Sequence, residues 1–324
     1  MFFILFGMNY MIRRLLIALG GNAIKQPAEK GTHEEQMRNV EIASLQIAQL
    51  AKHGYELVVT HGNGPQVGNL AIQQEAAIDQ VPSLPLVALG AMTQGQIGYM
   101  MQQNLQNILK GSKQVVAVVT QVVVDGNDPD FKDPTKPVGP FYLEGQAKLL
   151  AAERGWVVKK VKPNGEKTWR RVVPSPIPLR IVEAKAIKVL MEAGIIVIAS
   201  GGGGIPVIEN PNGMLSGIDA VIDKDRAGAR LAKEVEADVL MILTDVEYAM
   251  IDYGKPTQKP IRTMTISEAK QRIKEGHFGA GSMGPKIEAA LGFVRDGGEY
   301  AIITSLDKAI DALDGKTGTK ITSG

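Results

Sequence analysis

The sequence predicts an α/β protein, a three-layer αβα sandwich around an open and largely parallel sheet. Short runs rich in Val, Ile and Leu alternate with helix-period segments along most of the 324 residues, which is the rhythm of βαβ units. Most of these runs are apolar on both faces, as strands covered by helices on both sides are. The six strand candidates are residues 15–19, 56–60, 115–124, 195–199, 239–244 and 300–304.

Helices are predicted between these strands by their end signals. Thr32 and Glu35 have the spacing of a capping box, in which each side chain satisfies a backbone amide of the first turn. Apolar residues then recur at intervals of three and four up to Gly54, which is a typical C-terminal glycine. A second capping box, Thr265 with Glu268, opens a later helix. Helix therefore follows strand in regular alternation.

Segment 126–178 interrupts this alternation. It holds eight of the chain's 17 prolines, and proline is poorly tolerated inside helices and central strands. Asn164 and Gly165 lie between two strand-like runs, and this pair favours the positive φ angles of a type I′ hairpin turn. We expect a small subdomain that protrudes from the main sheet.

The composition is that of an ordinary globular protein and excludes several function classes. The formal net charge is only +2, from 36 Lys and Arg against 34 Asp and Glu, which argues against a nucleic-acid partner. The absence of cysteine excludes disulfides and thiolate chemistry and favours a cytoplasmic protein. The apolar start is far shorter than the roughly 20 residues that span a bilayer, so we expect no membrane association and treat 1–11 as an N-terminal extension.

Glycine-rich loops follow three of the strand candidates. In a parallel sheet the carboxyl ends of the strands share one edge, where bare glycine lets backbone N–H groups approach an anion. Any one loop could be only a tight turn, but three at one edge indicate a phosphate or a small oxyanion. A dinucleotide fingerprint is excluded by spacing, because Gly68 stands one residue late for G-x-G-x-x-G. The loops are Gly20-Gly21-Asn22, Gly62-Asn63-Gly64 and Gly201-Gly202-Gly203.

Two lysines stand where a helix begins. Lys224 precedes the helix expected over 226–235, and Lys286 follows Pro285 at the start of another. A lysine there opposes the helix dipole, and a bound phosphate would reverse that penalty, although a solvated lysine is the ordinary alternative. Asp245 ends a buried strand, where it could meet ribose or a metal or cap a helix.

These residues fit a reaction that proceeds without general-base catalysis. The sequence has neither a nucleophile elbow nor a metal-ligand spacing among its four histidines. Phosphoryl transfer to an oxygen that is already anionic depends mainly on alignment and on neutralising charge. The sequence therefore favours that reaction class.

Seven motifs resemble the carbamate kinases, a branch of the amino-acid-kinase family. They occur in the family's order, cover about residues 12–320, and several are long. They are ALGGNA (18–23), THGNGPQVG (60–68), PTKPVGPFY (134–142), WRRVVPSP (169–176), SGGGG (200–204), VIDKD (221–225) and GSMGPK (281–286). Thr168 stands where the family often has glycine.

The resemblance implies the amino-acid-kinase fold, usually as a homodimer. It also implies reversible phosphoryl transfer, in which ATP and carbamate give ADP and carbamoyl phosphate. The carbamate forms from ammonia and bicarbonate, and the reaction uses Mg²⁺. The resemblance further implies a role in arginine metabolism. Residues 12–205 would hold carbamate or carbamoyl phosphate, and residues 206–324 would hold the nucleotide. The protruding subdomain, about 126–178, would act as a lid.

The resemblance also assigns candidate site residues by motif. The catalytic group is Lys136, Lys224, Asp225 and Lys286. The substrate-binding group is Gly20, Gly21, Asn22, Gly62, Asn63, Gly64, Gly201, Gly202 and Gly203. The nucleotide-binding group is Thr244, Asp245, Tyr253, Ser282, Met283 and Gly284. Direct metal ligands are not readable, because Mg²⁺ binds mostly through phosphates and water.

Two alternatives stay open at this point. Acetylglutamate kinases of the same fold have a lysine where Ala18 stands here, and the long proline-rich segment also counts against that assignment. A nucleotide-sensing module without catalysis would have no need for Lys136, Lys224, Asp225 and Lys286 together. The physiological direction of the reaction depends on metabolite levels and not on the site.

Overall fold

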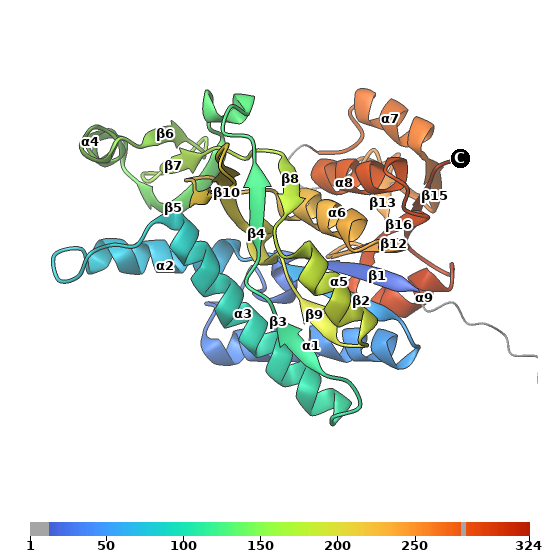
Figure 1. Cartoon of the computed structure of the whole chain (residues 1–324). Coiled ribbons are helices and arrows are strands. Elements are labelled where there is room, and N and C mark those ends of the chain that lie inside the picture. Colours follow the sequence, from blue (N-terminus) through green and yellow to red (C-terminus); the bar gives the residue numbers. More distant parts are fainter. Residues whose placement is uncertain (1–12, 280–282) are drawn as a thin grey trace, which may run out of the picture.

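A computed structural model describes residues 13–279 and 283–324 and confirms the α/β class. Its centre is an eight-stranded sheet (Figure 1) in which β17 runs antiparallel to β16 and the other neighbours pair in parallel. The pairing of β1 with β12 joins the two predicted lobes in one sheet, and the division near residue 205 stays a prediction. The strands, in sheet order, are β15 (Thr263–Thr265), β17 (Thr319–Thr322), β16 (Tyr300–Ser305), β12 (Val239–Thr244), β1 (Arg14–Leu19), β2 (Glu56–His61), β9 (Ile196–Ile198) and β3 (Val115–Ala117).

Helices cover both faces of this sheet, as predicted from strands that are apolar on both sides. Alternate residues of β1 point to opposite faces: Leu15 and Ile17 join one core cluster, and Leu16 and Ala18 join the other. The first cluster lies under α1 (His33–Lys52), α3 (Leu86–Leu109) and α9 (Ala309–Leu313). The second lies under α5 (Ala184–Glu192), α6 (Lys224–Glu234), α7 (Ile266–Lys274) and α8 (Met283–Arg295).

The helix starts predicted from the two capping boxes are confirmed at atomic detail. The capping boxes of Thr32 with Glu35 and of Thr265 with Glu268 open α1 and α7. Helix α6 begins at Lys224, two residues earlier than predicted, because the side chain of Asp223 caps it.

The single strand predicted over 115–124 is wrong. The chain leaves the central sheet after β3 and enters a second sheet as β4 (Gln121–Val124). Thr120 at the crossing is fully buried, and its backbone is bound by the side chain of Gln94: the Thr120 amide donates to Oε1 at 2.7 Å, and Nε2 donates to the Thr120 carbonyl at 3.1 Å. The Gln94 side chain thus satisfies both backbone groups of Thr120, and the Thr120 carbonyl also accepts from the Ile205 amide of the second sheet at 2.9 Å.

Two smaller sheets lie beside the central one. The second sheet has the order β11 (Leu215–Gly217), β10 (Ile205–Glu209), β4 and β8 (Pro178–Ile181). The third joins β5 (Lys136–Tyr142), β7 (Trp169–Val173) and β6 (Val157–Lys160), with α4 (Glu144–Arg154) between β5 and β6 along the chain. This sheet and α4 stand apart from the main body, near α2 (Gly64–Ala76) (Figure 1), and fall within the segment predicted to protrude. A hairpin of β13 (Ala249–Ile251) and β14 (Lys259–Ile261) completes the strands of the described residues.

The hairpin predicted in the subdomain is confirmed, but its turn type is wrong. Strands β6 and β7 pair antiparallel. Gly165 has φ +111°, whereas Asn164 is outside the positive-φ region. The Val161 amide donates to the Thr168 carbonyl at 2.8 Å, so the connecting loop is longer than a two-residue type I′ turn.

Two expectations from the sequence concern the N-terminal extension and membrane association. The predicted extension 1–11 lies outside them. Across residues 13–279 and 283–324, helices that are both long enough and apolar enough to cross a bilayer are absent.

Candidate active site

A cavity of about 920 Å³ opens where β1, β2 and β12 end, at the carboxyl edge of the central sheet. The loops after β1 and β2 line it with Gly20, Gly21, Asn22, Gly62, Asn63 and Gly64. The loop after β9 forms a short 3-10 helix, Gly201–Gly203, of which Gly202 lines the cavity. Gly201 and Gly203 are buried below it. The predicted convergence of the three glycine loops is therefore observed.

These loops approach one another so closely that a side chain at two of the glycines would be crowded. A Cβ at Gly62 would lie 3.2 Å from the Cα of Gly21. Gly202 has φ +67°, and a Cβ there would lie 2.2 Å from the Asn63 side chain. Glycine is favoured at both positions, because the Gly21 backbone lies close to Gly62 and Gly202 has a left-handed conformation.

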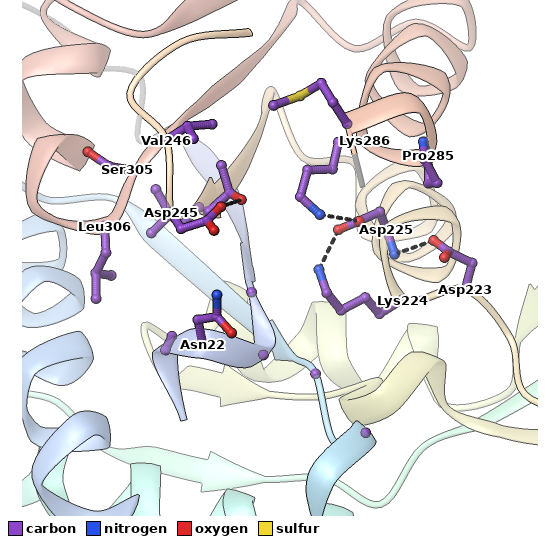
Figure 2. A pocket seen from close by; sticks show the side chains of 18 of the residues that line it. Asn22, Asp223, Lys224, Asp225, Asp245, Val246, Pro285, Lys286, Ser305 and Leu306 are labelled. Atoms are coloured by element: carbon purple, nitrogen blue, oxygen red, sulfur yellow. Dashed lines mark hydrogen bonds and ion pairs between the residues drawn. The ribbon is translucent and has the colours of Figure 1, made fainter. Parts of the chain in front are cut away.

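A compact cluster of opposite charges lies at the start of two helices beside these loops (Figure 2). The carboxylate of Asp225 accepts from Lys224 Nζ at 2.7 Å and from Lys286 Nζ at 3.0 Å. Asp225 is only 3% exposed, while both lysines line the cavity. Two ammonium groups and one carboxylate leave a net charge of +1. The N-terminal ends of α6 and α8 add their positive dipoles, so the cluster suits an anion.

The ionisation of this cluster follows from burial and pairing. Burial opposes the charged form of Asp225, but the ammonium groups of Lys224 and Lys286 outweigh it and hold the pKa of that carboxyl below its usual range. Burial lowers the pKa of Lys224, and Asp225 opposes that shift. A bound anion would favour the protonated amine of Lys224 in the same way that Asp225 does.

Asp223 connects Lys136 of the subdomain to this cluster and was not singled out from the sequence. One oxygen, Oδ1, accepts from the backbone amides of Asp225 at 3.0 Å and Arg226 at 3.3 Å, which caps α6. The other, Oδ2, accepts from Lys136 Nζ at 3.3 Å. Lys136 comes from β5 of the subdomain and lines the cavity, as predicted. The N-cap preference for aspartate could have identified Asp223 as the start of α6.

His61 supports the glycine loops from behind, which the sequence did not reveal. The residue is 1% exposed, and a Cβ on Gly201 would lie 2.3 Å from its Nε2, so the ring packs directly on that glycine. Nδ1 lies 3.0 Å from the carbonyl oxygen of Gly62 and donates to it. Burial lowers the pKa of His61 to about 4, so the ring is neutral at physiological pH and does not serve as an anion-binding cation.

The same cavity is lined by most of the residues predicted to meet a nucleotide. Thr244, Asp245, Tyr253 and Met283 line it, and the Thr244 hydroxyl donates to Asp245 Oδ1 at 3.0 Å. Gly284 is not among the lining residues, and Ser282 lies outside the described residues. Lining residues that the sequence reasoning missed are Ala23, Gln26, Ile42, Gln46, Pro65, Val221, Ile222, Leu243, Val246, Tyr248, Met250, His277, Phe278, Gly279, Pro285, Ser305, Leu306 and Asp307.

Comparisons with known proteins agree with this geometry and confirm the resemblance. The sequence model of the Amino acid kinase family matches residues 13–305. The chain is 54% identical to the carbamate kinase of Pyrococcus horikoshii, over 96% of this chain and 100% of that protein. It is 56% identical to the carbamate kinase of Thermococcus kodakarensis, over 96% and 99%.

A solved structure gives the same result in three dimensions. The carbamate kinase from Giardia lamblia bound to AMP-PNP superposes with a TM-score of 0.90 at 48% identity, covering 96% of this chain and 99% of that one. Sequence and structure agree over nearly the full length. The chain therefore belongs to the amino acid kinase family and, within it, to the carbamate kinases.

Proposed function

We propose that the chain catalyses reversible phosphoryl transfer from ATP to carbamate, giving ADP and carbamoyl phosphate. The observation that carries this proposal is the cluster of Lys224, Asp225 and Lys286 beside three converging glycine loops. A carbamate oxygen forms a bond to the γ-phosphorus as the bond from that phosphorus to the ADP oxygen breaks. The attacking oxygen is already anionic, so the step needs no proton transfer.

Lys224 and Lys286 would stabilise the phosphoryl group during its transfer. The transferring phosphoryl would lie between Lys224 and Lys286, with Asp225 holding both ammonium groups in place. Backbone N–H groups of the glycine loops and Lys136 would contact the remaining oxygens. Fixed charges that need no reorganisation lower the barrier to phosphoryl transfer mainly by electrostatic stabilisation and alignment.

The nucleotide would bind in the part of the cavity lined by Thr244, Asp245, Tyr253 and Met283. The Giardia lamblia relative that was solved bound to AMP-PNP supports ATP as the donor. This assignment leaves the part of the cavity near Lys136 and Asn63 for the acceptor.

We propose Mg²⁺ as the cation that accompanies the nucleotide. Among the described residues, groups of three His, Asp or Glu side chains that could hold a metal are absent, and both oxygens of Asp225 accept from lysines. The residues therefore fit a cation held mainly by phosphate oxygens and water, with the exposed carboxylate of Asp245 nearest the nucleotide end. When bound, Mg²⁺ would neutralise negative charge on the phosphates.

We further propose a cytoplasmic homodimer that acts in arginine metabolism. Large apolar side chains are exposed on α1 and α3, which pack against each other: Leu45 is 46% exposed, Met92 43% and Tyr99 53%. Exposed apolar groups on neighbouring helices support a protein interface. Light scattering after size-exclusion chromatography should give twice the chain mass of 34.8 kDa, and a monomer would contradict the dimer.

The test of the activity is ATP formation from ADP, Mg²⁺ and carbamoyl phosphate, with wild type beside Lys286→Ala. We expect the variant to lose about 100-fold or more in kcat, as when one stabilising group is removed from a transition state. Lys270→Ala, an exposed lysine on α7, is the matched control and should retain wild-type rates.

Other outcomes would change the assignment in defined ways. Full activity in Lys286→Ala would keep the reaction and refute the site. Activity only with a different acyl phosphate would indicate a sister kinase of the same fold. Tight ADP binding without phosphoryl exchange would indicate a nucleotide sensor.

A further inference from the structure

Ser200, just after β9, has a backbone conformation that is unusual for serine. Its φ and ψ angles are +53° and +33°, in the left-handed region that a Cβ atom disfavours. The residue is fully buried, and its hydroxyl has no hydrogen-bond partner among the described residues. Strained backbone persists only where its surroundings hold it in place. The side chain of Ser200 does not do this, so neighbouring groups must.

Two buried threonines bind the backbone of Ser200 from opposite sides. The Oγ1 of Thr60 donates to the Ser200 carbonyl at 2.9 Å, and the Ser200 amide donates to Oγ1 of Thr120 at 2.9 Å. Thr60 belongs to β2, which pairs with β9 on one side, and Thr120 follows β3, which pairs with β9 on the other. Thr60 is 1% exposed and Thr120 is fully buried, so water does not compete for these bonds.

The oxygen of Thr120 is fixed as an acceptor for this purpose. Its hydroxyl donates to the Val118 carbonyl at 2.8 Å, which leaves its lone pairs for the Ser200 amide. Its backbone is held by Gln94 on both sides. The amide of Ser200 therefore has a rigid partner, and Thr60 completes the hold from the carbonyl side.

The hydrogen bond from Thr60 is linked directly to the glycine loop. The Ser200 carbonyl also accepts from the Gly203 amide at 3.1 Å, the bond that closes the short 3-10 turn. Gly202, in the middle of this turn, lines the active-site cavity. His61, the residue after Thr60, packs its ring against the same turn. The last two residues of β2 therefore set the position of the loop that follows β9.

A third threonine at this sheet edge shows that burial alone does not produce such a contact. Thr304 is the penultimate residue of β16, as Thr60 is of β2. Thr304 is fully buried, but its hydroxyl lacks a hydrogen-bond partner within residues 13–279 and 283–324. The two positions are matched in burial and in place along the strand, and they differ in the bond to Ser200.

We propose that Thr60 is a positioning residue for phosphoryl transfer, which together with Thr120 holds Ser200 in its left-handed conformation. The inference rests on the proposed function and deepens it. Neither threonine lines the active-site cavity, so Thr60 acts through the loop and not by contact with substrate. Preorganised backbone groups stabilise a transition state only where they stay in place, and the fixed Ser200 peptide keeps Gly202 in the wall of the cavity.

The test measures ATP formation from ADP, Mg²⁺ and carbamoyl phosphate in Thr60→Val beside Thr304→Val. Valine has nearly the shape of threonine but lacks the hydroxyl. We expect kcat to fall about tenfold in Thr60→Val, less than the roughly 100-fold cost of a misplacement by about 1 Å, with the KM for ADP unchanged. Thr304→Val should retain the wild-type kcat. Thr60→Ser keeps the hydroxyl and should recover most of the activity.

A double-mutant cycle with Ser200→Gly tests whether the backbone of Ser200 carries the effect. Glycine adopts the left-handed conformation without a steric penalty, so this variant has less need of the bond from Thr60. In the Ser200→Gly background we expect Thr60→Val to lower kcat only about twofold, against about tenfold in wild type. A merely structural role of Thr60 would lower the melting temperature and leave the kcat of the folded enzyme unchanged.

Four results would overturn the inference. They are a wild-type kcat in Thr60→Val, the same loss in Thr304→Val, the same loss in Thr60→Ser, or an equal loss of kcat with and without Ser200→Gly. Thermal melting checks that each variant is folded. If Thr60→Val is unfolded, its double variant with Ser200→Gly takes over the test. That variant should match the kcat of Ser200→Gly, and an unfolded or inactive double variant would refute the inference.

The melting temperatures of the same cycle separate this inference from the proposed function. If Ser200→Gly reduces the loss of melting temperature caused by Thr60→Val while wild type forms no ATP, the proposed reaction fails and the hold of Thr60 on Ser200 is supported. If wild type forms ATP but the two losses of melting temperature and of kcat are equal in both backgrounds, the reaction stands and the inference fails.

Discussion

Asp223 links the subdomain to helix α6, and its replacement by asparagine is expected to weaken turnover through Lys136. Oδ1 of Asp223 caps α6, and Oδ2 accepts from Lys136 Nζ at 3.3 Å. Asparagine caps helices about as well as aspartate, so Asp223→Asn keeps the helix start. The variant loses only the charge that holds Lys136 at the edge of the active site.

The size of the effect follows from distance and exposure. The side chain of Asp223 is 18% exposed and that of Lys136 is 39% exposed, so water screens the pair. Two unit charges 3.3 Å apart attract by about 1.3 kcal/mol in bulk water, and exposed pairs typically contribute about 0.2–1 kcal/mol. We take about 1 kcal/mol, which corresponds to roughly a fivefold loss in kcat/KM.

A double-mutant cycle separates positioning of Lys136 from any other role of Asp223. We expect about a fivefold loss in Asp223→Asn and about a hundredfold loss or more in Lys136→Met. The double variant should be no worse than Lys136→Met alone. Glu288→Gln removes the partner of Arg226 at the same end of α6 and should leave kcat/KM unchanged. If the two losses multiply in the double variant, Asp223 does not act through Lys136 and the reasoning is refuted.

Two further predictions concern the loops at the sheet edge. Gly62→Val should abolish turnover while far-UV circular dichroism stays unchanged, because a Cβ there would lie 3.2 Å from the Gly21 Cα; normal turnover would exclude the oxyanion cradle. The unfolding free energy of wild type should fall by about 3 kcal/mol as the pH drops from 6.5 to 4. Over that range His61 takes up a proton in the unfolded state but not in the folded state, where its pKa is about 4. Urea denaturation should show a flatter profile for His61→Asn but not for His33→Asn, an exposed site, and equal slopes would contradict the assignment.

The fold was largely predictable because its signals are local. Capping boxes at Thr32 and Thr265 require only residues within one helical turn, and strands buried on both faces are visible as unbroken apolar runs. The strand prediction over 115–124 was wrong for the same reason, because it too used only local signals. Its valines fit a strand everywhere, and the break depends on Gln94, which is 26 residues away from Thr120. A local pattern cannot show which sheet a strand joins.

The site was predictable in part. Lys224 and Lys286 stand where a helix dipole disfavours them, which is a local sign of a bound anion. The role of Asp223 depends on a neighbour far away in sequence, because Lys136 is 87 residues from Asp223.

The charges of the site are divided between the main body and the subdomain. Lys224 and Lys286 belong to α6 and α8, while Lys136 belongs to β5 of the subdomain. With Asp223 and Asp225, these three cations leave a net charge of +1. An anion bound among them would be attracted from both sides, so we expect bound substrate to strengthen the contact between the subdomain and the main body.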